Sequence, residues 1–263
     1  MPSHIELGLG IIGLGKPWGH VASEVPSEFE ALALLEFACL TGIRYFDSAP
    51  SYGVAEERLG IFLRSLDPQQ HRGLTIATKF GEHWDADRNE PFVDHSYDAL
   101  CRSLDRSLRH LGRIDILQLH KTTPEALRSA DLGRAWDYAA SLGISRIGAS
   151  VSDLESAEMV IGEARYGCIQ LPLNRANTKF STSVDRASAR GMWIATNRPF
   201  AMGAMPSGKE AFRFVLDYAF TGVVLTGTKS REHLRENWQS FHSAALSSTP
   251  VTEPSTPVTE PRA

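Results

Sequence analysis

Apolar runs of strand length alternate along this chain with longer segments whose apolar residues recur at helical spacing. The alternation is repeated eight times, and many of the strand-like runs are rich in β-branched or aromatic residues. Strands separated by helical segments predict a parallel sheet, and eight of them allow it to close into a (β/α)8 TIM barrel. The predicted strands cover residues 7–15, 43–49, 74–80, 114–120, 145–151, 168–173, 192–197 and 223–226, and the predicted helices cover residues 27–40, 55–66, 96–111, 124–142, 153–164, 182–190, 209–220 and 231–242.

The last residues of the chain differ in composition from those before them. The segment Ser248–Pro254 is repeated as Ser255–Pro261. Each copy contains two prolines and no aromatic residue, so it cannot contribute a core and is predicted to be disordered or extended. We therefore predict a single barrel over residues 1–245 and a Ser/Thr/Pro-rich tail over residues 246–263.

Composition and charge agree with a soluble enzyme. The chain has 263 residues, of which 42% are hydrophobic, and this is enough for one large core. A formal net charge of −4 gives no basis for binding nucleic acid or an anionic membrane surface. The odd number of cysteines, three, favours free thiols in a reducing compartment. We find no apolar stretch long enough to cross a membrane and no pattern of a secretory leader, so a cytoplasmic location is expected. We expect no metal site, and a monomer or weak oligomer.

Four polar residues stand at or just beyond the ends of predicted strands, where a parallel barrel gathers side chains onto one face. Asp47, Lys79 and His120 lie at three strand ends, and Tyr52 follows in the loop after the first. Tyr52 is the natural proton donor to a carbonyl that accepts hydride, because an ammonium from Lys79 would lower the phenol pKa from about 10. Asp47 would keep that ammonium charged, and His120 would orient the carbonyl oxygen.

These residues also carry a family resemblance. Asp47-Ser-Ala-x-x-Tyr52-Gly, the strand-end Lys79 and Leu-Gln-Leu-His120 resemble the catalytic tetrad of the aldo-keto reductases, and the similarity extends over residues 7–237. The resemblance implies a (β/α)8 barrel that uses NADPH, less often NADH. It also implies hydride transfer between the nicotinamide and a small aldehyde or ketone, with Tyr52 as general acid or base.

A glycine pattern near the N-terminus gives a different signal. Gly8, Gly10 and Gly13 match the dinucleotide fingerprint of the doubly wound fold. That fingerprint requires a strand before it and a helix that begins at once, whereas Pro17 and further glycines follow here. The context therefore favours a strand and then a loop.

Contacts to the nicotinamide are expected from the later strands. Ser150 ends the fifth strand and Gln170 lies in the sixth, where the resemblance implies hydrogen bonds to the carboxamide. The segment from Asn197 through Arg198 to Phe200 resembles the one that commonly supplies a tyrosine stacked on the nicotinamide, but Asn197 is not aromatic.

The segment after the last strand is expected to bind the adenosine end of the cofactor. It resembles the corresponding segment of the family, and a helix N-terminus with Thr228 suits phosphate on physical grounds. The cations Lys229 and Arg231 suit a ribose 2′-phosphate, so NADPH is preferred over NADH. The residues assigned to this site are Gly227, Thr228, Lys229, Arg231, Glu236 and Asn237.

Aromatic residues after the first and third strands are candidates for the rim of the substrate pocket. They are Trp18, Phe80, His83 and Trp84, and each could instead pack a loop against the barrel. Two other functions stay open for the whole chain. One is a regulatory subunit that senses nicotinamide nucleotides with little turnover, and the other is a non-redox barrel isomerase that uses the same Asp, Lys and His residues.

Overall fold

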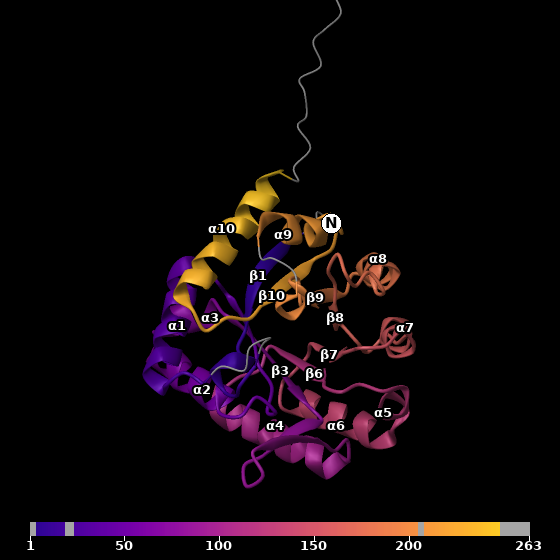
Figure 1. Cartoon of the computed structure of the whole chain (residues 1–263). Coiled ribbons are helices and arrows are strands. Elements are labelled where there is room, and N and C mark those ends of the chain that lie inside the picture. The colour runs from indigo at the N-terminus through magenta and orange to yellow at the C-terminus, as the bar shows by residue number, and fades with distance from the viewer. Residues whose placement is uncertain (1–3, 19–23, 205–207, 248–263) are drawn as a thin grey trace, which may run out of the picture.

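The computed structural model describes residues 4–18, 24–204 and 208–247, and within them the strands close into a barrel (Figure 1). The barrel strands in this part of the chain are β1 (Ile5–Gly10), β2 (Tyr45–Asp47), β3 (Thr75–Phe80), β6 (Ile116–Leu119), β7 (Ile147–Ser150), β8 (Cys168–Pro172), β9 (Trp193–Asn197) and β10 (Gly222–Thr226). They follow one another around the barrel in the order β1-β10-β9-β8-β7-β6-β3-β2, and every neighbouring pair is parallel. The predicted (β/α)8 architecture is confirmed.

Helices lie around the outside of the barrel and connect its strands (Figure 1). The first, α1 (Glu28–Thr41), begins with the capping box that the sequence indicates. The side chain of Ser27 accepts a hydrogen bond from the backbone N–H of Glu30, and the Glu30 carboxylate accepts one from the Ser27 N–H at 2.8 Å. The remaining helices are α2 (Ala55–Ser65), α3 (Pro68–Arg72), α4 (Tyr97–Leu111), α5 (Pro124–Arg128), α6 (Ala130–Ser141), α7 (Leu154–Gly162), α8 (Ser181–Ala189), α9 (Lys209–Leu216) and α10 (Arg231–Ser247).

Most predicted elements differ from the observed ones by a few residues at one or both ends, and two differences are larger. The first strand was expected over residues 7–15 but ends at Gly10, which pairs with the last residue of β2. No neighbouring strand continues beyond that pair, and a short 3₁₀ helix, η1 (Ile12–Leu14), follows. The helix expected over residues 124–142 is divided into α5 and α6, because Ser129 adopts an extended conformation and caps the second helix.

A hairpin that the sequence analysis did not predict follows β3. Its strands β4 (Glu82–Asp85) and β5 (Glu90–Val93) are antiparallel and form a separate two-stranded sheet. The first strand of the hairpin begins two residues after the end of β3. It therefore lies beside the carboxyl ends of the barrel strands, where the site was expected.

The inside of the barrel changes from apolar to polar along the strands. Side chains two residues apart on a strand share a face, so Tyr45 and Asp47 point inward together, as do Ala77 and Lys79. Tyr45 and Ala77 belong to a buried apolar cluster inside the barrel. Asp47 and Lys79 are buried polar residues that follow them toward the carboxyl ends of the strands. The other buried members of the apolar cluster are Ile116, Cys168, Ala195, Val223 and Leu225.

The structure also bears on three further expectations. Cys168 is buried, whereas Cys39 and Cys101 are half-buried, and all three are free thiols. Within the described residues, none of the helices combines the length and the apolar character that a membrane crossing requires. Helix α10 includes the first two residues of the predicted tail, and residues 248–263 lie outside the described part of the chain.

Candidate active site

The four predicted catalytic residues come from three adjacent strands and one loop. Asp47 is the last residue of β2, Lys79 lies in β3, and His120 directly follows β6. These strands are neighbours in the barrel. Tyr52 lies in the loop between β2 and α2. The closed sheet thus brings together four side chains that are far apart in the sequence.

Lys79 is at the centre of this cluster. Its Nζ donates hydrogen bonds to Oδ2 of Asp47 at 2.6 Å, to the backbone oxygen of Ser48 at 2.8 Å and to the hydroxyl of Tyr52 at 3.5 Å. Only 1% of the Lys79 side chain is exposed, so its charge is compensated by Asp47 rather than by water. Gln170 extends the network, because its Nε2 donates to Oδ1 of Asp47 at 3.3 Å.

The pKa values within the cluster follow from burial and from these contacts. Burial raises the pKa of Tyr52 more than the charge of Lys79 lowers it, and Asp47 raises it further. The expected net lowering of this pKa is therefore wrong in direction. Burial alone would lower the pKa of Lys79, but Asp47 and Tyr52 together raise it above its usual value. At neutral pH the phenol is protonated and the ammonium is charged, which are the forms that a proton donor and its electrostatic partner need.

A carboxylate that the sequence analysis did not single out lies beside His120. Glu82 is buried, and its Oε2 lies 3.0 Å from Nδ1 of His120 and accepts a hydrogen bond from Ser51 at 2.7 Å. The ring is not aligned for a hydrogen bond to Glu82, so this contact is electrostatic. Oε1 of Glu82 lies 3.3 Å from Nζ of Lys121. Burial, followed by the charges of Lys79 and Lys121, holds the pKa of His120 well below its usual range, so the ring is neutral at neutral pH.

A cavity of about 600 Å³ opens over the cluster. Asp47, Tyr52 and His120 line it, whereas Lys79 is buried behind them. Side chains from the later strands form the opposite part of the wall. Those that were predicted to contact the cofactor are Ser150, Gln170, Asn197, Arg198, Phe200, Gly227, Thr228 and Lys229.

Two buried acceptors in this wall fit the predicted cofactor. Oε1 of Gln170 and Oδ1 of Asn197 are buried and have no hydrogen-bond partner among the described residues. Buried acceptors of this kind are rarely left without a donor, and the amino group of a nicotinamide carboxamide supplies two N–H donors. Ser150, whose strand pairs it with Gln170, lines the same region. The residues present are therefore compatible with a nicotinamide ring at this end of the cavity.

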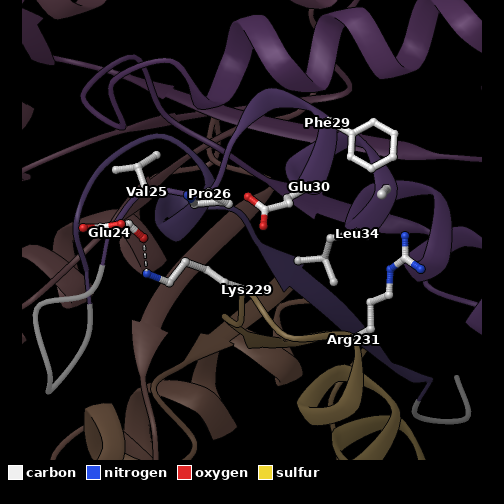
Figure 2. Close-up of a pocket in the computed structure, with 9 residues that line it drawn as sticks. Glu24, Val25, Pro26, Phe29, Glu30, Leu34, Lys229 and Arg231 are labelled. Carbon is white, nitrogen blue, oxygen red and sulfur yellow. Dashed lines mark hydrogen bonds between the residues drawn. The ribbon is translucent and has the colours of Figure 1, made fainter.

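A second groove of about 500 Å³ adjoins the cavity at Lys229, and Figure 2 shows the residues that line this groove. It lies between the beginning of α1 and the segment after β10, and Lys229 lines both spaces. Arg231 lines only the groove. Glu236 is exposed and Asn237 is buried, and among the described residues neither belongs to the wall of the cavity or of the groove.

The groove contains charges of both signs (Figure 2). Nζ of Lys229 donates a hydrogen bond to the backbone oxygen of Glu24 at 2.8 Å. Glu30, which caps α1, also lines the groove opposite Lys229 and Arg231. The two predicted cations are therefore accompanied by two acidic residues that the sequence analysis did not consider.

The predicted substrate residues lie in three different places. Trp18 lines the cavity and is 43% exposed. Phe80 does not line it, because Lys79 points into the barrel and the next residue on the strand therefore points outward, where Phe80 is fully buried in the core. His83 and Trp84 line a separate groove between the hairpin and α4. Among these four residues, the structure thus brings only Trp18 to the wall of the cavity.

Comparison with known proteins places these features in context. The model of the Aldo/keto reductase family matches residues 6–210. A pyridoxal 4-dehydrogenase of Microbacterium luteolum is 36% identical over 138 residues, and a D-threo-aldose 1-dehydrogenase of a Pseudomonas species is 35% identical over 143 residues. The matches cover 43% and 45% of this chain and 39% and 43% of those proteins, so the chain spans about two fifths of their length.

Two solved structures share the fold over most of both chains. One is a protein of Pseudomonas aeruginosa, provisionally named an aldo-keto reductase, with a TM-score of 0.79 and 26% identity over 91% of this chain and 90% of that chain. The other is an aldo-keto reductase of Bacillus halodurans in its holo form, with a TM-score of 0.78 and 20% identity over 94% of this chain and 88% of that chain. At 20% identity the second likeness concerns the fold alone.

Proposed function

Since the chain belongs to the aldo/keto reductase family, we propose that it is an NAD(P)H-dependent oxidoreductase that interconverts a small aldehyde or ketone and the matching alcohol. The observation that supports this most directly is the position of Lys79. Its ammonium is within 2.6 Å of the Asp47 carboxylate and 3.5 Å of the Tyr52 hydroxyl, beneath a cavity that the phenol and His120 line.

Each side chain has a separate task in the proposed reaction. A nicotinamide held by Ser150, Gln170 and Asn197 would supply hydride to the carbonyl carbon and accept it in the reverse direction. Tyr52 gives its hydroxyl proton to the carbonyl oxygen, so that the oxygen becomes a hydroxyl group and the phenol becomes a phenolate. The Lys79 ammonium stabilises that phenolate, Asp47 keeps Lys79 charged, and solvent returns a proton to Tyr52. His120 contacts the reacting oxygen and fixes its position.

The variant Tyr52→Phe tests the proton-donor role. General acid catalysis by a positioned side chain contributes about 10²- to 10⁴-fold, so kcat for carbonyl reduction should fall by at least that range. The dissociation constant for NADPH should stay measurable, because the phenol does not hold the nucleotide in this proposal. Tyr138→Phe is the matched control, since its hydroxyl bonds Asp105 between α4 and α6. Unchanged turnover in Tyr52→Phe would reject the assignment.

Substrate and cofactor are proposed at the level of chemical class. A screen of NAD(P)H oxidation should include simple aldehydes, aldoses and pyridoxal, with the reverse reaction of sugars and alcohols. The same screen separates the two other functions that the sequence leaves open. Tight nucleotide binding without turnover would indicate a regulatory subunit, and failure to bind any nicotinamide nucleotide would indicate a non-redox barrel.

A further inference from the structure

Lys16 is a charged residue of the cavity that the proposed acid–base chemistry does not use. It follows η1 in the loop after β1, is half-buried, and lines the cavity together with Tyr52 and His120. Its Nζ lies 5.7 Å from the centroid of the Tyr52 ring and 5.4 Å from that of the Trp84 ring. The ammonium is thus held next to the phenol that is proposed to give up the proton.

The other charges at this end of the cavity are compensated by one another. Asp47 is paired with Lys79 at 2.6 Å. The two oxygens of Glu82 are approached by Ser51, His120 and Lys121 at 3.3 Å or less. Among the described residues, Glu82 is therefore paired with Lys121 and makes no ion pair with Lys16.

Lys16 is in a different situation. Among the described residues its Nζ makes no ion pair and no hydrogen bond, and its close neighbours are the faces of two aromatic rings. Burial lowers the pKa of Lys16, Glu82 partly offsets that effect by raising it, and Lys121 lowers it again. Aromatic faces attract a cation but replace neither a carboxylate nor the full hydration of an ammonium. An anion that entered the cavity would supply the missing partner.

Resting on the function proposed above, we propose that Lys16 recognises an anionic group, a carboxylate or a phosphate, on the carbonyl substrate. The anion would stand a few bonds from the reacting carbonyl, because Lys16 adjoins the ring of Tyr52 itself. The substrate class is therefore a short oxo acid or a phosphorylated aldehyde rather than a simple apolar aldehyde.

The variant Lys16→Met tests this, because methionine keeps an unbranched side chain and removes the charge. Two matched pairs of substrates are needed: 4-oxobutanoate with butanal, and glyceraldehyde 3-phosphate with glyceraldehyde. In Lys16→Met, kcat/KM for the preferred charged substrate should fall about ten- to hundred-fold, the usual scale of a hydrogen bond to a charged group. The neutral partner should change less than about two-fold, and Lys16→Arg should recover most of the loss. The pair that shows the loss tells whether carboxylate or phosphate is the preferred anion.

Lys179→Met is the control for loss of one positive charge, because Lys179 is exposed, stacks on Phe180 and lies outside the cavity wall. It should leave all four substrates unaffected. Equal losses of kcat/KM for charged and neutral substrates in Lys16→Met would overturn the proposal. A larger dissociation constant for NADPH in that variant would also overturn the proposal, because Lys16 would then bind the nucleotide.

Direct binding separates failure of this inference from failure of the proposed function. Calorimetric titration of 4-oxobutanoate and of glyceraldehyde 3-phosphate into the full chain needs no turnover. At least one of them should bind, and Lys16→Met should bind it at least ten-fold more weakly. Equal affinity of the two proteins for these compounds would refute the role of Lys16, even if no aldehyde is reduced. If Lys16→Met lost affinity but neither protein reduced an aldehyde, the anion subsite would be supported and the proposed reductase activity would be rejected.

Discussion

The position of Glu82 beside Nδ1 favours one of the two neutral tautomers of His120. A neutral imidazole holds one proton, and a carboxylate oxygen 3.0 Å from Nδ1 stabilises that proton on Nδ1 and repels a lone pair there. Nε2 is then left as a hydrogen-bond acceptor. In the oxidation direction, the alcohol hydroxyl would then donate to Nε2 of His120, whereas the carbonyl oxygen, which only accepts, would be bound by the Tyr52 hydroxyl.

The variant Glu82→Gln tests this arrangement. Loss of the charge should allow the ring proton of His120 to move between the nitrogens, and kcat should fall about ten-fold, a partial loss of positioning within general acid–base catalysis. The ¹⁵N chemical shifts of the imidazole report the tautomer directly. Glu90→Gln on the same hairpin is the control, because Glu90 is exposed and its carboxylate, within the described residues, is paired with Arg88 at 3.9 Å. An unchanged tautomer in Glu82→Gln would contradict the argument.

The raised pKa of Tyr52 makes a prediction about pH. An acid whose pKa is raised stays protonated to higher pH, so carbonyl reduction should be nearly flat through neutrality and fall only above about pH 10. Oxidation of the alcohol needs the phenolate and should still be rising at that pH. Lys79, Asp47 and Glu82 contribute to this direction, and the Lys16 ammonium also faces the phenol, 5.7 Å from the centroid of its ring. A plateau of the oxidation rate below pH 8 would contradict it.

Single residues were predictable where the strand pattern fixed their place. Asp47, Lys79 and His120 were located because a polar residue at the end of an apolar run can be found without knowing any contact. Glu82 could not be found in this way, because it stands in a hairpin without an apolar alternation. Phe80 was misplaced because proximity to Lys79 along the chain does not fix the direction of a side chain, and successive residues of β3 face opposite sides of the sheet.

At the scale of elements, the loop after β1 is packed tightly against the loop that carries Tyr52. A Cβ atom at Gly15 would lie 1.8 Å from the backbone oxygen of Tyr52 and 2.4 Å from the backbone nitrogen of Ala55. The N–H of Val54 also donates to the Gly15 oxygen at 3.4 Å. The position of Tyr52, the proposed proton donor, therefore depends on a residue without a side chain in a neighbouring loop.

The variant Gly15→Ala should separate these two loops. Crowding of this kind typically destabilises by about 1–3 kcal/mol, and displacement of Tyr52 should lower kcat as well. Thermal unfolding and steady-state kinetics measure the two effects. Gly133→Ala is the control, because Gly133 lies within α6 with no atom near its missing Cβ, and alanine there should stabilise the helix slightly. Wild-type stability and kcat in Gly15→Ala would show that the loops are not coupled.

The elements themselves were largely predictable, and their ends were not. Strand order and number follow from the repeated alternation of apolar runs and helical segments. The ends depend on contacts across the sheet, as at Gly10, where the partner strand stops. The break at Ser129 depends on a side chain that caps a new helix. The apolar residues on both sides of Ser129 have helical spacing, so the sequence pattern does not indicate this break.

At the scale of the whole molecule, the barrel is divided into two functional parts. The proposed acid–base residues come from β2, β3 and β6 and the loops that follow them. The proposed nucleotide contacts come from the carboxyl ends of β7, β8, β9 and β10. The cavity lies where the two parts face each other, and the groove beside Lys229 continues it toward α1.

The two cations of the proposed nucleotide site lead to a prediction about the choice between NADPH and NADH. Replacing both Lys229 and Arg231 by Ala should weaken NADPH more than NADH, because a ribose 2′-phosphate adds two negative charges that these cations would contact. Glu24 and Glu30 in the same groove reduce the net positive charge, so the preference should be modest, on the order of ten-fold. Dissociation constants for both nucleotides provide the measurement. Equal losses would remove the basis for preferring NADPH.

The closure of the barrel has a consequence for ancestry and for engineering. With β1 counted in the first part, the two parts of the described barrel meet at two seams, between β6 and β7 and between β1 and β10, and the chain passes from the first part to the second near Gly143. A single genetic crossover at that point would join the acid–base residues of one relative to the strands β7–β10 of another. Chimeras made there should keep the proton chemistry of the first parent, and their coenzyme preference should depend on both parents, because Glu24 and Glu30 come from the first and Lys229 and Arg231 from the second.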